Sequence, residues 1–296
     1  MKRADARVIV LDFDGTMTDA EAEGAPFRAG YLDDLAALVG VDAQELRFAA
    51  IVAEVEARLA THPERHPFRW KGKAVAPASV DPYLRMVPIA DAIFDQFGAF
   101  ADPTDRGRLT GGVLYKHNYA LTKGRPVFRP GAADVLRALA ATETYVVTNS
   151  HTAAVAEKIQ LLDRDGGGGV AWLAPRVRGN AQKFEIDDAW TDVPAELAIP
   201  GLVDRPVLLR RRCYHDRLRD LIAAAGVSFA ELIVVGDIFE LDLALPLALG
   251  AQVVLVASAH TPRYELDYVA ALPRGRVVGA LPELLDFFGL PATTAA

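Results

Sequence analysis

The chain has a single cysteine, Cys213, among its 296 residues. One cysteine excludes an intramolecular disulfide and a metal site built from several cysteines, so the sequence fits the reducing cytoplasm. A large excess of one charge sign is also absent, because 32 Lys and Arg stand against 39 Asp and Glu for a net charge of only −7. This balance gives no reason to expect a nucleic acid or an anionic membrane as the main partner.

Long apolar runs are scarce as well. The N-terminal run at residues 8–11 ends at Asp12 and is far too short for the core of a signal peptide. The longest apolar tract, residues 243–259, is interrupted by Pro246 and Gly250, which favours a helix end, a turn and a buried strand over a membrane span. We therefore expect a soluble, cytoplasmic protein.

The composition is that of an ordinary globular protein, with 51% hydrophobic and 24% charged residues. This composition argues against a disordered, collagen-like or coiled-coil chain. The length is roughly twice that of a typical domain of about 150 residues. It predicts two folded units, or one α/β domain with a large insertion.

Short apolar runs rich in β-branched residues alternate with helical patterns along much of the chain. The runs lack polar and apolar alternation, as expected for strands of a sheet that helices cover on both faces. The predicted strands are residues 8–11, 145–147, 232–235 and 252–256, and the predicted helices are residues 132–141, 153–162 and 214–225, the last ended by Gly226. The pattern predicts an α/β fold with a doubly wound parallel sheet, whose polar strand ends converge in one site.

A long segment between the first two predicted strands has helical periodicity of its own. Its apolar residues recur at helical spacing over residues 32–39, 46–59 and 83–97. We therefore predict that a helical domain, residues 20–128, is inserted after the first strand. The core domain would comprise residues 1–19 and 129–296.

Two stretches have no periodic pattern. Residues 61–78 contain three prolines and Gly72 and predict a loop or linker, and residues 163–204 form a second irregular stretch. The second stretch includes four consecutive glycines at residues 166–169. A phosphate-binding loop would follow such glycines with Gly-Lys-Ser/Thr, whereas Val170 comes next here, so we interpret the glycines as a flexible loop.

The most informative segment, Asp12-Phe13-Asp14-Gly15-Thr16, directly follows the first predicted strand. In an extended chain residues i and i+2 point the same way, so Asp12 and Asp14 would lie together. Neighbouring carboxylates repel unless a cation lies between them or one holds a proton, and both arrangements are useful in phosphoryl transfer. A calcium loop is the alternative, with Glu23 at its twelfth position, but the strand before Asp12 argues against it.

A second acidic pair, Asp237 and Asp242, follows the strand that ends at residue 235. An Asp after a strand is often only a helix cap. Together with Asp12 and Asp14, however, this pair supplies the hard oxygen ligands that Mg²⁺ favours. The four aspartates are therefore the candidate metal ligands.

In their order along the chain, these segments resemble the motifs of the haloacid dehalogenase-like (HAD) superfamily of hydrolases. The first family motif, Asp-x-Asp-Gly-Thr, stands at residues 12–16. The second, an apolar strand that ends in Thr or Ser, stands at residues 146–150, and the fourth, Gly-Asp with a further Asp downstream, begins at Gly236. The resemblance implies a Rossmann-like core with an α-helical cap.

The third family motif is normally a Lys at the start of the helix before the fourth-motif strand, and here the sequence departs from the pattern. Arg212 stands in that place. Arginine keeps the positive charge but offers a planar fork in place of a point charge. Lys183 or Lys158 could fill the role instead, and a further alternative is that no residue does.

The resemblance implies a Mg²⁺-dependent phosphatase that hydrolyses a small phosphorylated metabolite through an aspartyl-phosphate intermediate. Asp12 would be the nucleophile and Asp14 the general acid and base. Thr148 would hydrogen-bond the transferred phosphoryl group, and Arg212 would offset its charge. The candidate substrate-binding residues are Thr16, Asn149, Lys116 and His117.

By the same resemblance, Mg²⁺ would be bridged by Asp12, the backbone carbonyl of Asp14 and Asp237, while Asp242 would orient the waters of the metal or Arg212. A phosphomutase shares this catalytic set and is the nearest alternative. The other alternative, suggested by the arginine at the third motif and by the irregular stretch at residues 163–204, is a catalytically weak protein that binds a phosphorylated ligand or a partner protein. The sequence is also compatible with a homodimer.

Overall fold

The computed structural model describes residues 7–122 and 125–291, and the chain forms two compact units. The core unit comprises the chain up to Asp19, the short segment Arg69–Ala76 and the chain from Phe128 onward. The inserted unit comprises Ala20–Phe68 and Pro77–Val127. The segment Arg69–Ala76 thus belongs to the core unit although it lies within the predicted insertion.

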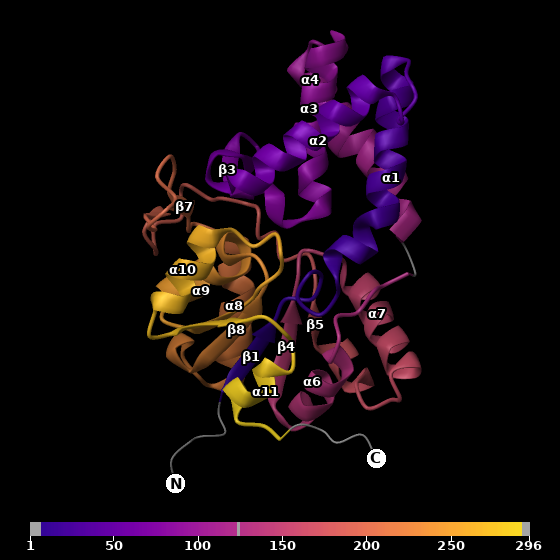
Figure 1. Cartoon of the computed structure of the whole chain (residues 1–296). Helices are drawn as coiled ribbons and strands as arrows, with labels where there is room; N and C mark the ends of the chain where they lie inside the picture. Colours follow the sequence, from indigo (N-terminus) through magenta and orange to yellow (C-terminus); the bar gives the residue numbers. More distant parts are fainter. Residues whose placement is uncertain (1–6, 123–124, 292–296) are drawn as a thin grey trace. The chain divides into compact units, whose positions relative to one another are not determined.

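The core unit is built on a six-stranded sheet in which every neighbouring pair is parallel (Figure 1). The strands, in the order in which they lie in the sheet, are β10 (Gly275–Val278), β9 (Gln252–Val256), β8 (Leu232–Gly236), β1 (Val8–Leu11), β4 (Glu143–Val147) and β5 (Val177–Arg178). Leu11 pairs with Val146 on one side and with Val235 on the other, so these three strands end at the same level. The four predicted strands are confirmed, and β5 and β10 are additional.

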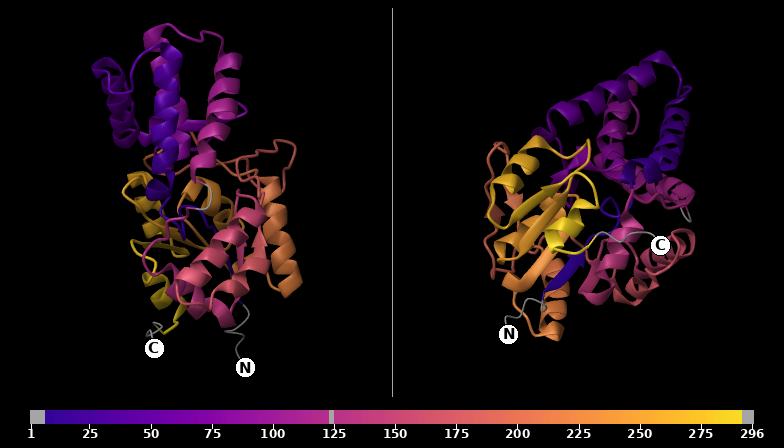
Figure 2. Two further views of the ribbon diagram at one scale, coloured as in Figure 1. Left: turned by 90° about the vertical axis from the view of Figure 1, so that its right-hand side faces the viewer. Right: turned by 60° about the horizontal axis from the view of Figure 1, so that its bottom comes forward.

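Helices cover both faces of this sheet, as the parallel arrangement requires (Figure 2). Val8 and Val10 of β1 contribute to the apolar core on one face, and Ile9 and Leu11 contribute to the core on the other. The first face packs against α8 (Arg212–Ala225), α9 (Ala244–Ala248) and α10 (Arg263–Ala271), and the second against α6 (Ala132–Ala138), α7 (Thr152–Asp165) and α11 (Glu283–Phe288). As predicted, α8 ends at Gly226, which adopts the left-handed conformation that glycine tolerates best.

The inserted unit is helical, as the periodicity predicts. Its three long helices are α1 (Ala20–Val39), α2 (Leu46–Thr61) and α3 (Pro82–Phe97), followed by α4 (Pro103–Gly107), a π-helical turn at Arg108–Leu114, α5 (Tyr115–Tyr119) and a final 3₁₀ turn at Ala120–Thr122. Their apolar faces form one core that includes Phe27, Leu35, Phe48 and Ile89. Among the described helices of both units, none is long and apolar enough to span a membrane.

The prediction of a loop at residues 61–78 is wrong, because this stretch contains a β-hairpin. Its strands are β2 (Pro67–Trp70) and β3 (Lys73–Pro77), between short 3₁₀ turns at Pro63–Arg65 and Ala78–Val80. The turn residues Lys71 and Gly72 both have positive φ, 49° and 80°, as in the tight two-residue turns that suit hairpins. The prolines suggested a loop, but they lie at strand ends and in a 3₁₀ turn, where they break no ladder.

The stretch at residues 163–204 is mostly irregular, as predicted, but it holds the edge strand β5 and a 3₁₀ turn at Ala171–Arg176. The glycine run follows α7 as a turn, in which Arg137 donates to the carbonyls of Gly166 and Gly168 over 2.8 and 3.0 Å. Further on, β6 (Glu196–Leu197) pairs with β7 (Val207–Leu208) in a small antiparallel ribbon.

Candidate active site

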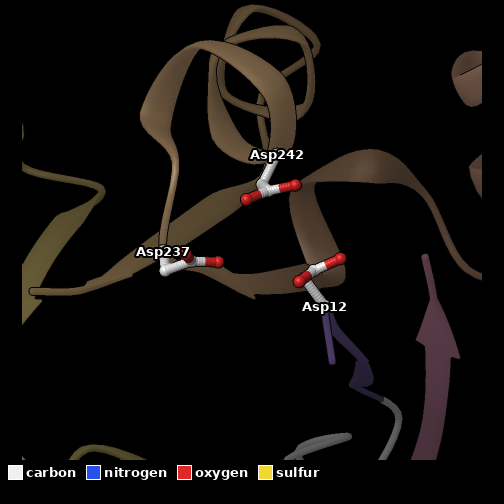
Figure 3. A group of neighbouring side chains, drawn as sticks. All are labelled: Asp12, Asp237 and Asp242. Atoms are coloured by element: carbon white, nitrogen blue, oxygen red, sulfur yellow. The ribbon is translucent and has the colours of Figure 1, made fainter. Parts of the chain in front are cut away.

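Three carboxylates from two parts of the chain meet at the carboxyl end of the sheet (Figure 3). Asp12 follows β1, whereas Asp237 and Asp242 follow β8, and one oxygen of each lies within 4.8 Å of the others. The N–H of Asp12 donates to the carbonyl of Val235 over 2.8 Å, which continues the β1–β8 ladder as far as the first aspartate. The strand register therefore brings together acidic groups that lie 225 residues apart in the chain.

The cation in this cluster is Lys183. Its Nζ lies 2.7 Å from Oδ1 of Asp12 and 2.8 Å from Oδ1 of Asp242, and the residue is only 1% exposed. The sequence offered Lys183 as an alternative for the third family motif. Of these two residues, the structure brings Lys183 and not Arg212 to the carboxylates.

Arg212 lies at the start of α8 with 56% of its side chain exposed. Its guanidinium lies 3.6 Å from a carboxylate oxygen of Asp187 and 3.8 Å from one of Asp216, both of which are partly exposed. The structure does not bring Arg212, the residue predicted to offset the phosphoryl charge, to the carboxylates. That prediction assumed that the cation begins the helix. In this chain an irregular segment separates Lys183 from α8.

The backbone around Lys183 is held by the segment that follows β4. The N–H of Lys183 donates to Oδ1 of Asn149 over 2.7 Å, and the N–H of Asn180 donates to the carbonyl of Ser150 over 2.9 Å. Asn180 and Gln182 adopt left-handed backbone angles, with φ of 52° and 51°. Such angles are uncommon in residues other than glycine. This unusual backbone is a local reason why sequence periodicity does not reveal the position of Lys183.

Burial and repulsion dominate the electrostatics of the cluster. Burial raises the pKa of Asp12 to about 7, while Lys183 opposes this shift and Asp242 adds to it. Desolvation, together with the charges of Asp242 and Asp12, raises the pKa of Asp237 well above its usual value. Burial disfavours the ammonium of Lys183, but the charges of Asp12 and Asp242 outweigh this effect and raise its pKa. Asp12 and Asp237 therefore hold their protons more tightly than exposed aspartates do, because one ammonium does not offset three ionised carboxylates.

The turn after Asp12 requires a residue without a side chain at position 15. Gly15 has a φ of +84°, and a Cβ placed there would lie 2.3 Å from Oδ2 of Asp237. The hydroxyl of Thr16, a predicted substrate-binding residue, lies 3.0 Å from Oδ1 of Asp237 and 3.3 Å from Oδ2 of Asp12. This turn thus allows Asp237 to approach Asp12 closely.

The side chain of Asp14 has its own partners, distinct from those of Asp12. Its Oδ2 accepts a hydrogen bond from Oγ of Ser150 over 2.5 Å, and its Oδ1 pairs with Nζ of Lys158 at 2.7 Å. The expected side-by-side arrangement of Asp12 and Asp14 rested on an extended chain. In the structure the strand ends at Leu11 and a turn begins at Asp14, but the Asp14 carboxylate still lies close enough to Asp12 for its charge to raise the pKa of Asp12.

The other predicted site residues lie in two places. Thr148, almost fully buried after β4, accepts a hydrogen bond from the N–H of Ser150 over 3.2 Å. Lys116 and His117 belong to α5 of the inserted unit. Lys116 is exposed, and Nδ1 of His117 lies 2.9 Å from Asp34.

Arg129 is a supporting residue that the sequence analysis did not single out. Its Nε donates to the carbonyl of Gly15 over 2.9 Å, and its Nη1 donates to the carbonyl of Ala257 over 3.2 Å, so it joins the turn after β1 to the end of β9. Its backbone N–H also donates to the carbonyl of Met17 over 3.0 Å. Sequence reasoning had no signal for this contact, since Arg129 stands alone among loop residues.

No family model and no curated protein sequence matches the chain. Among solved structures, an HAD-hydrolase of Bacillus subtilis, bound to magnesium, is similar with a TM-score of 0.53, 15% identity and coverage of 96% of this chain and 99% of that one. A haloacid dehalogenase-like protein of unknown function from Agrobacterium tumefaciens has a TM-score of 0.52, 15% identity and coverage of 96% and 97%. A predicted phosphoglycolate phosphatase from Haemophilus somnus has a TM-score of 0.52, 14% identity and coverage of 97% and 99%. The chain therefore has the fold of HAD-like hydrolases, as its motifs predict.

Proposed function

We propose that the chain is a Mg²⁺-dependent phosphomonoester hydrolase that uses Asp12 as its nucleophile and acts on a small phosphorylated metabolite. One observation carries the proposal. Asp12, at the end of the central strand β1, pairs with the buried Lys183 beside the carboxylates of Asp237 and Asp242. An aspartate held next to an ammonium and further acids is suited to attack an anionic phosphoryl group, provided that the excess negative charge is offset.

The donor set fits a hard divalent cation. Asp12, Asp237 and the backbone carbonyl of Asp14 would hold Mg²⁺, which would offset the repulsion between the acids and polarise the phosphoryl oxygens. Asp242 is better suited to orient its neighbours, because its Oδ1 accepts from Lys183 over 2.8 Å and its Oδ2 accepts from the N–H of Ile238 over 3.0 Å.

In the first step a carboxylate oxygen of Asp12 attacks phosphorus, the bond from phosphorus to the leaving oxygen breaks, and an aspartyl-phosphate forms. Asp14 gives its proton to the leaving oxygen. Lys183 offsets charge on the phosphoryl group, and Thr148, whose Oγ1 accepts from Ser150, keeps its own proton to donate to a phosphoryl oxygen.

In the second step Asp14 takes a proton from a water molecule, which attacks the phosphorus of the aspartyl-phosphate. The bond between phosphorus and Asp12 breaks, releasing inorganic phosphate and restoring the carboxylate. Ser150 and Lys158 hold the Asp14 carboxylate after β4 and would set its orientation for both transfers.

The test is Mg²⁺-dependent release of phosphate from an activated aryl phosphate, followed by a panel of phosphorylated metabolites. Phosphoglycolate belongs in the panel because of the similar Haemophilus somnus structure. We expect Asp12→Asn to lower kcat by at least about 10³-fold, since the amide cannot replace the nucleophile. The control is Asp220→Asn, an exposed residue on α8, which should leave kcat unchanged.

Other outcomes would contradict the proposal. Transfer of phosphate between two positions of a sugar phosphate, without phosphate release, would identify a phosphomutase. Equal inertness of the wild type and Asp12→Asn, with Mg²⁺ still bound, would identify a phospholigand-binding protein. The contact between Lys183 and Asp12 weakens the case for this last reading, because an arginine in place of the motif lysine was one of its two motivations.

A further inference from the structure

The hairpin tip, Arg69–Ala76, binds the chain just beyond Lys183. Nε1 of Trp70 donates to Oε1 of Glu185 over 2.9 Å. Nζ of Lys71 lies 2.8 and 2.9 Å from the two oxygens of the same carboxylate. The turn of the hairpin is therefore attached two residues after Lys183.

A second set of contacts holds the same segment a few residues further on. Lys73, on β3, forms an ion pair with Asp188. Nη1 of Arg210 donates to the carbonyl of Asp188 over 2.8 Å, and the N–H of Asp187 donates back to the carbonyl of Arg210 over 2.8 Å. The segment after Lys183 thus lies between the hairpin and the chain that leads into α8.

Arg211 joins these parts from the inside. Its Nη1 donates to the carbonyl of Lys183, its Nη2 donates to the carbonyl of Val75 on β3 over 2.8 Å, and its Nε donates to the carbonyl of Leu208 over 3.1 Å. The residue is fully buried. One guanidinium therefore connects Lys183, the hairpin and the residues before α8.

The hydrogen-bond partners of Arg211 indicate a role in holding the backbone. All of its described hydrogen bonds go to backbone carbonyls, and burial lowers its pKa to about 10. A buried cation without a bonded carboxylate is costly. In return, the rigid fork of the guanidinium fixes three carbonyls relative to one another, which a single lysine amine cannot do.

The backbone at Lys183 needs such support. The left-handed angle of Gln182 is unfavourable, and an angle of this kind persists only where the surrounding structure enforces it. Asn180 tolerates this conformation better, as asparagine generally does. Asn149 holds the N–H of Lys183, and Arg211 holds its carbonyl. The two contacts therefore fix both backbone polar groups of Lys183, its N–H and its carbonyl.

We propose that Arg211 and the hairpin tip Arg69–Ala76 are positioning elements that hold Lys183 against Asp12. The role of Lys183 in the reaction rests on the proposed function, whereas the mechanical link does not. A hairpin that lies between α2 and α3 in the sequence thus becomes part of the support of the site. Arg211 touches none of the reacting groups and acts through the backbone of Lys183.

Hydrogen exchange tests the mechanical link without any assay of activity. In the tip variant Trp70→Ala/Lys71→Met/Lys73→Met, we expect the amides of residues 183–188 to exchange at least about 10-fold faster, because local opening becomes easier. Arg211→Met should raise the rates further and extend the effect to residues 69–76. The control is Arg263→Met, which breaks an exposed ion pair with Asp267 on α10 and should leave these rates unchanged.

Kinetics test the positioning role. We expect Arg211→Met to lower kcat at least about 10-fold while KM stays within twofold, and Arg211→Lys to recover only part of the loss. Combined with Lys183→Met, the Arg211→Met change should cause no further loss, because a positioning residue has nothing left to position. A merely structural role would instead multiply the two losses.

The two measurements separate the possible failures. If the wild type releases no phosphate, the proposed function fails and exchange alone decides the mechanical link. Unchanged exchange at residues 183–188 in the tip variant overturns the link to the hairpin, even if Arg211→Met does not fold. Multiplicative kinetic losses overturn the positioning role of Arg211.

Discussion

Oδ1 of Asp12 and Nζ of Lys183 lie 2.7 Å apart, yet the two residues are held in position by different kinds of structure. Asp12 continues a central strand, and its N–H still takes part in the ladder through the carbonyl of Val235. Lys183 lies in an irregular segment that runs through two left-handed residues and is held by the side chains of Asn149 and Arg211.

The two positions should differ in how well they withstand substitutions elsewhere in the chain. Backbone ladder hydrogen bonds do not depend on the side chains that form the strand, so many sequences can place an aspartate after β1. The position of Lys183 depends on particular side chains, one of them 28 residues further along the chain. Substitutions far from the site should therefore leave the position of Asp12 unchanged but can displace Lys183.

The largest effect is expected from removing the cation itself. Lys183→Met leaves Asp12 and Asp242 buried without their partner, and we expect a loss of about 3 kcal/mol in the free energy of unfolding. Urea denaturation at pH 8 with a chelator measures it. The strand should keep Asp12 in place, so the far-ultraviolet circular dichroism spectrum should not change.

A matched control for this variant is Lys158→Met, which breaks the ion pair with the more exposed Asp14. We expect a loss below about 1 kcal/mol, because solvent screens that pair more strongly. Equal losses in the two variants would mean that burial of the Lys183 pair makes no difference.

The second prediction concerns the free energy that the folded state loses when Asp12 ionises, because the strand keeps its carboxyl group buried in either protonation state. Burial raises its pKa from 3.8 in the unfolded chain to about 7 in the folded one, so the folded state binds more protons between these values. Stability without metal is therefore fully present below about pH 4 and falls as the pH rises toward about 7, by roughly 2 to 4 kcal/mol. Mg²⁺ should reverse the fall, because it binds the ionised carboxylate.

The measurement is the difference in unfolding free energy between the wild type and Asp12→Asn at several pH values, with chelator and then with Mg²⁺. The variant removes this titration and cancels contributions from other groups. In the presence of chelator, we expect the wild type to lose stability relative to Asp12→Asn as the pH rises. If its relative stability stays constant or increases, burial does not disfavour the ionised carboxylate of Asp12.

The parts of the fold that the sequence predicts are those fixed by local patterns. The apolar runs before Asp12 and Asp237 were predicted as strands, and the parallel arrangement that followed from them placed both aspartates at one edge of the sheet. Gly226 likewise marked the end of α8. In each case the residues that determine the structure are neighbours in the chain.

The remaining parts depend on contacts between distant residues. Periodicity does not locate Lys183, because left-handed residues precede it and its support comes from Asn149 and Arg211. The hairpin of β2 and β3 is predicted as a loop from its sequence because the prolines at its strand ends are interpreted without knowledge of the strand pairing. The partners of Asp14, Ser150 and Lys158, likewise come from the segment after β4, which local sequence patterns do not reveal.

The smallest expected effect concerns the backbone that precedes Lys183. Gln182 is exposed and has a φ of 51°, so Gln182→Gly removes a steric cost of about 1–2 kcal/mol while adding about 0.5–1 kcal/mol of chain entropy to the unfolded state. We expect a net stabilisation below about 1 kcal/mol, measured by urea denaturation. Gln160→Gly, on the exposed face of α7, should instead destabilise by about 0.5–1 kcal/mol. If Gln182→Gly destabilises the protein as much as Gln160→Gly does, the backbone before Lys183 carries no strain. The positions of Lys183 and Asp12 would then differ only in the side-chain contacts that support Lys183.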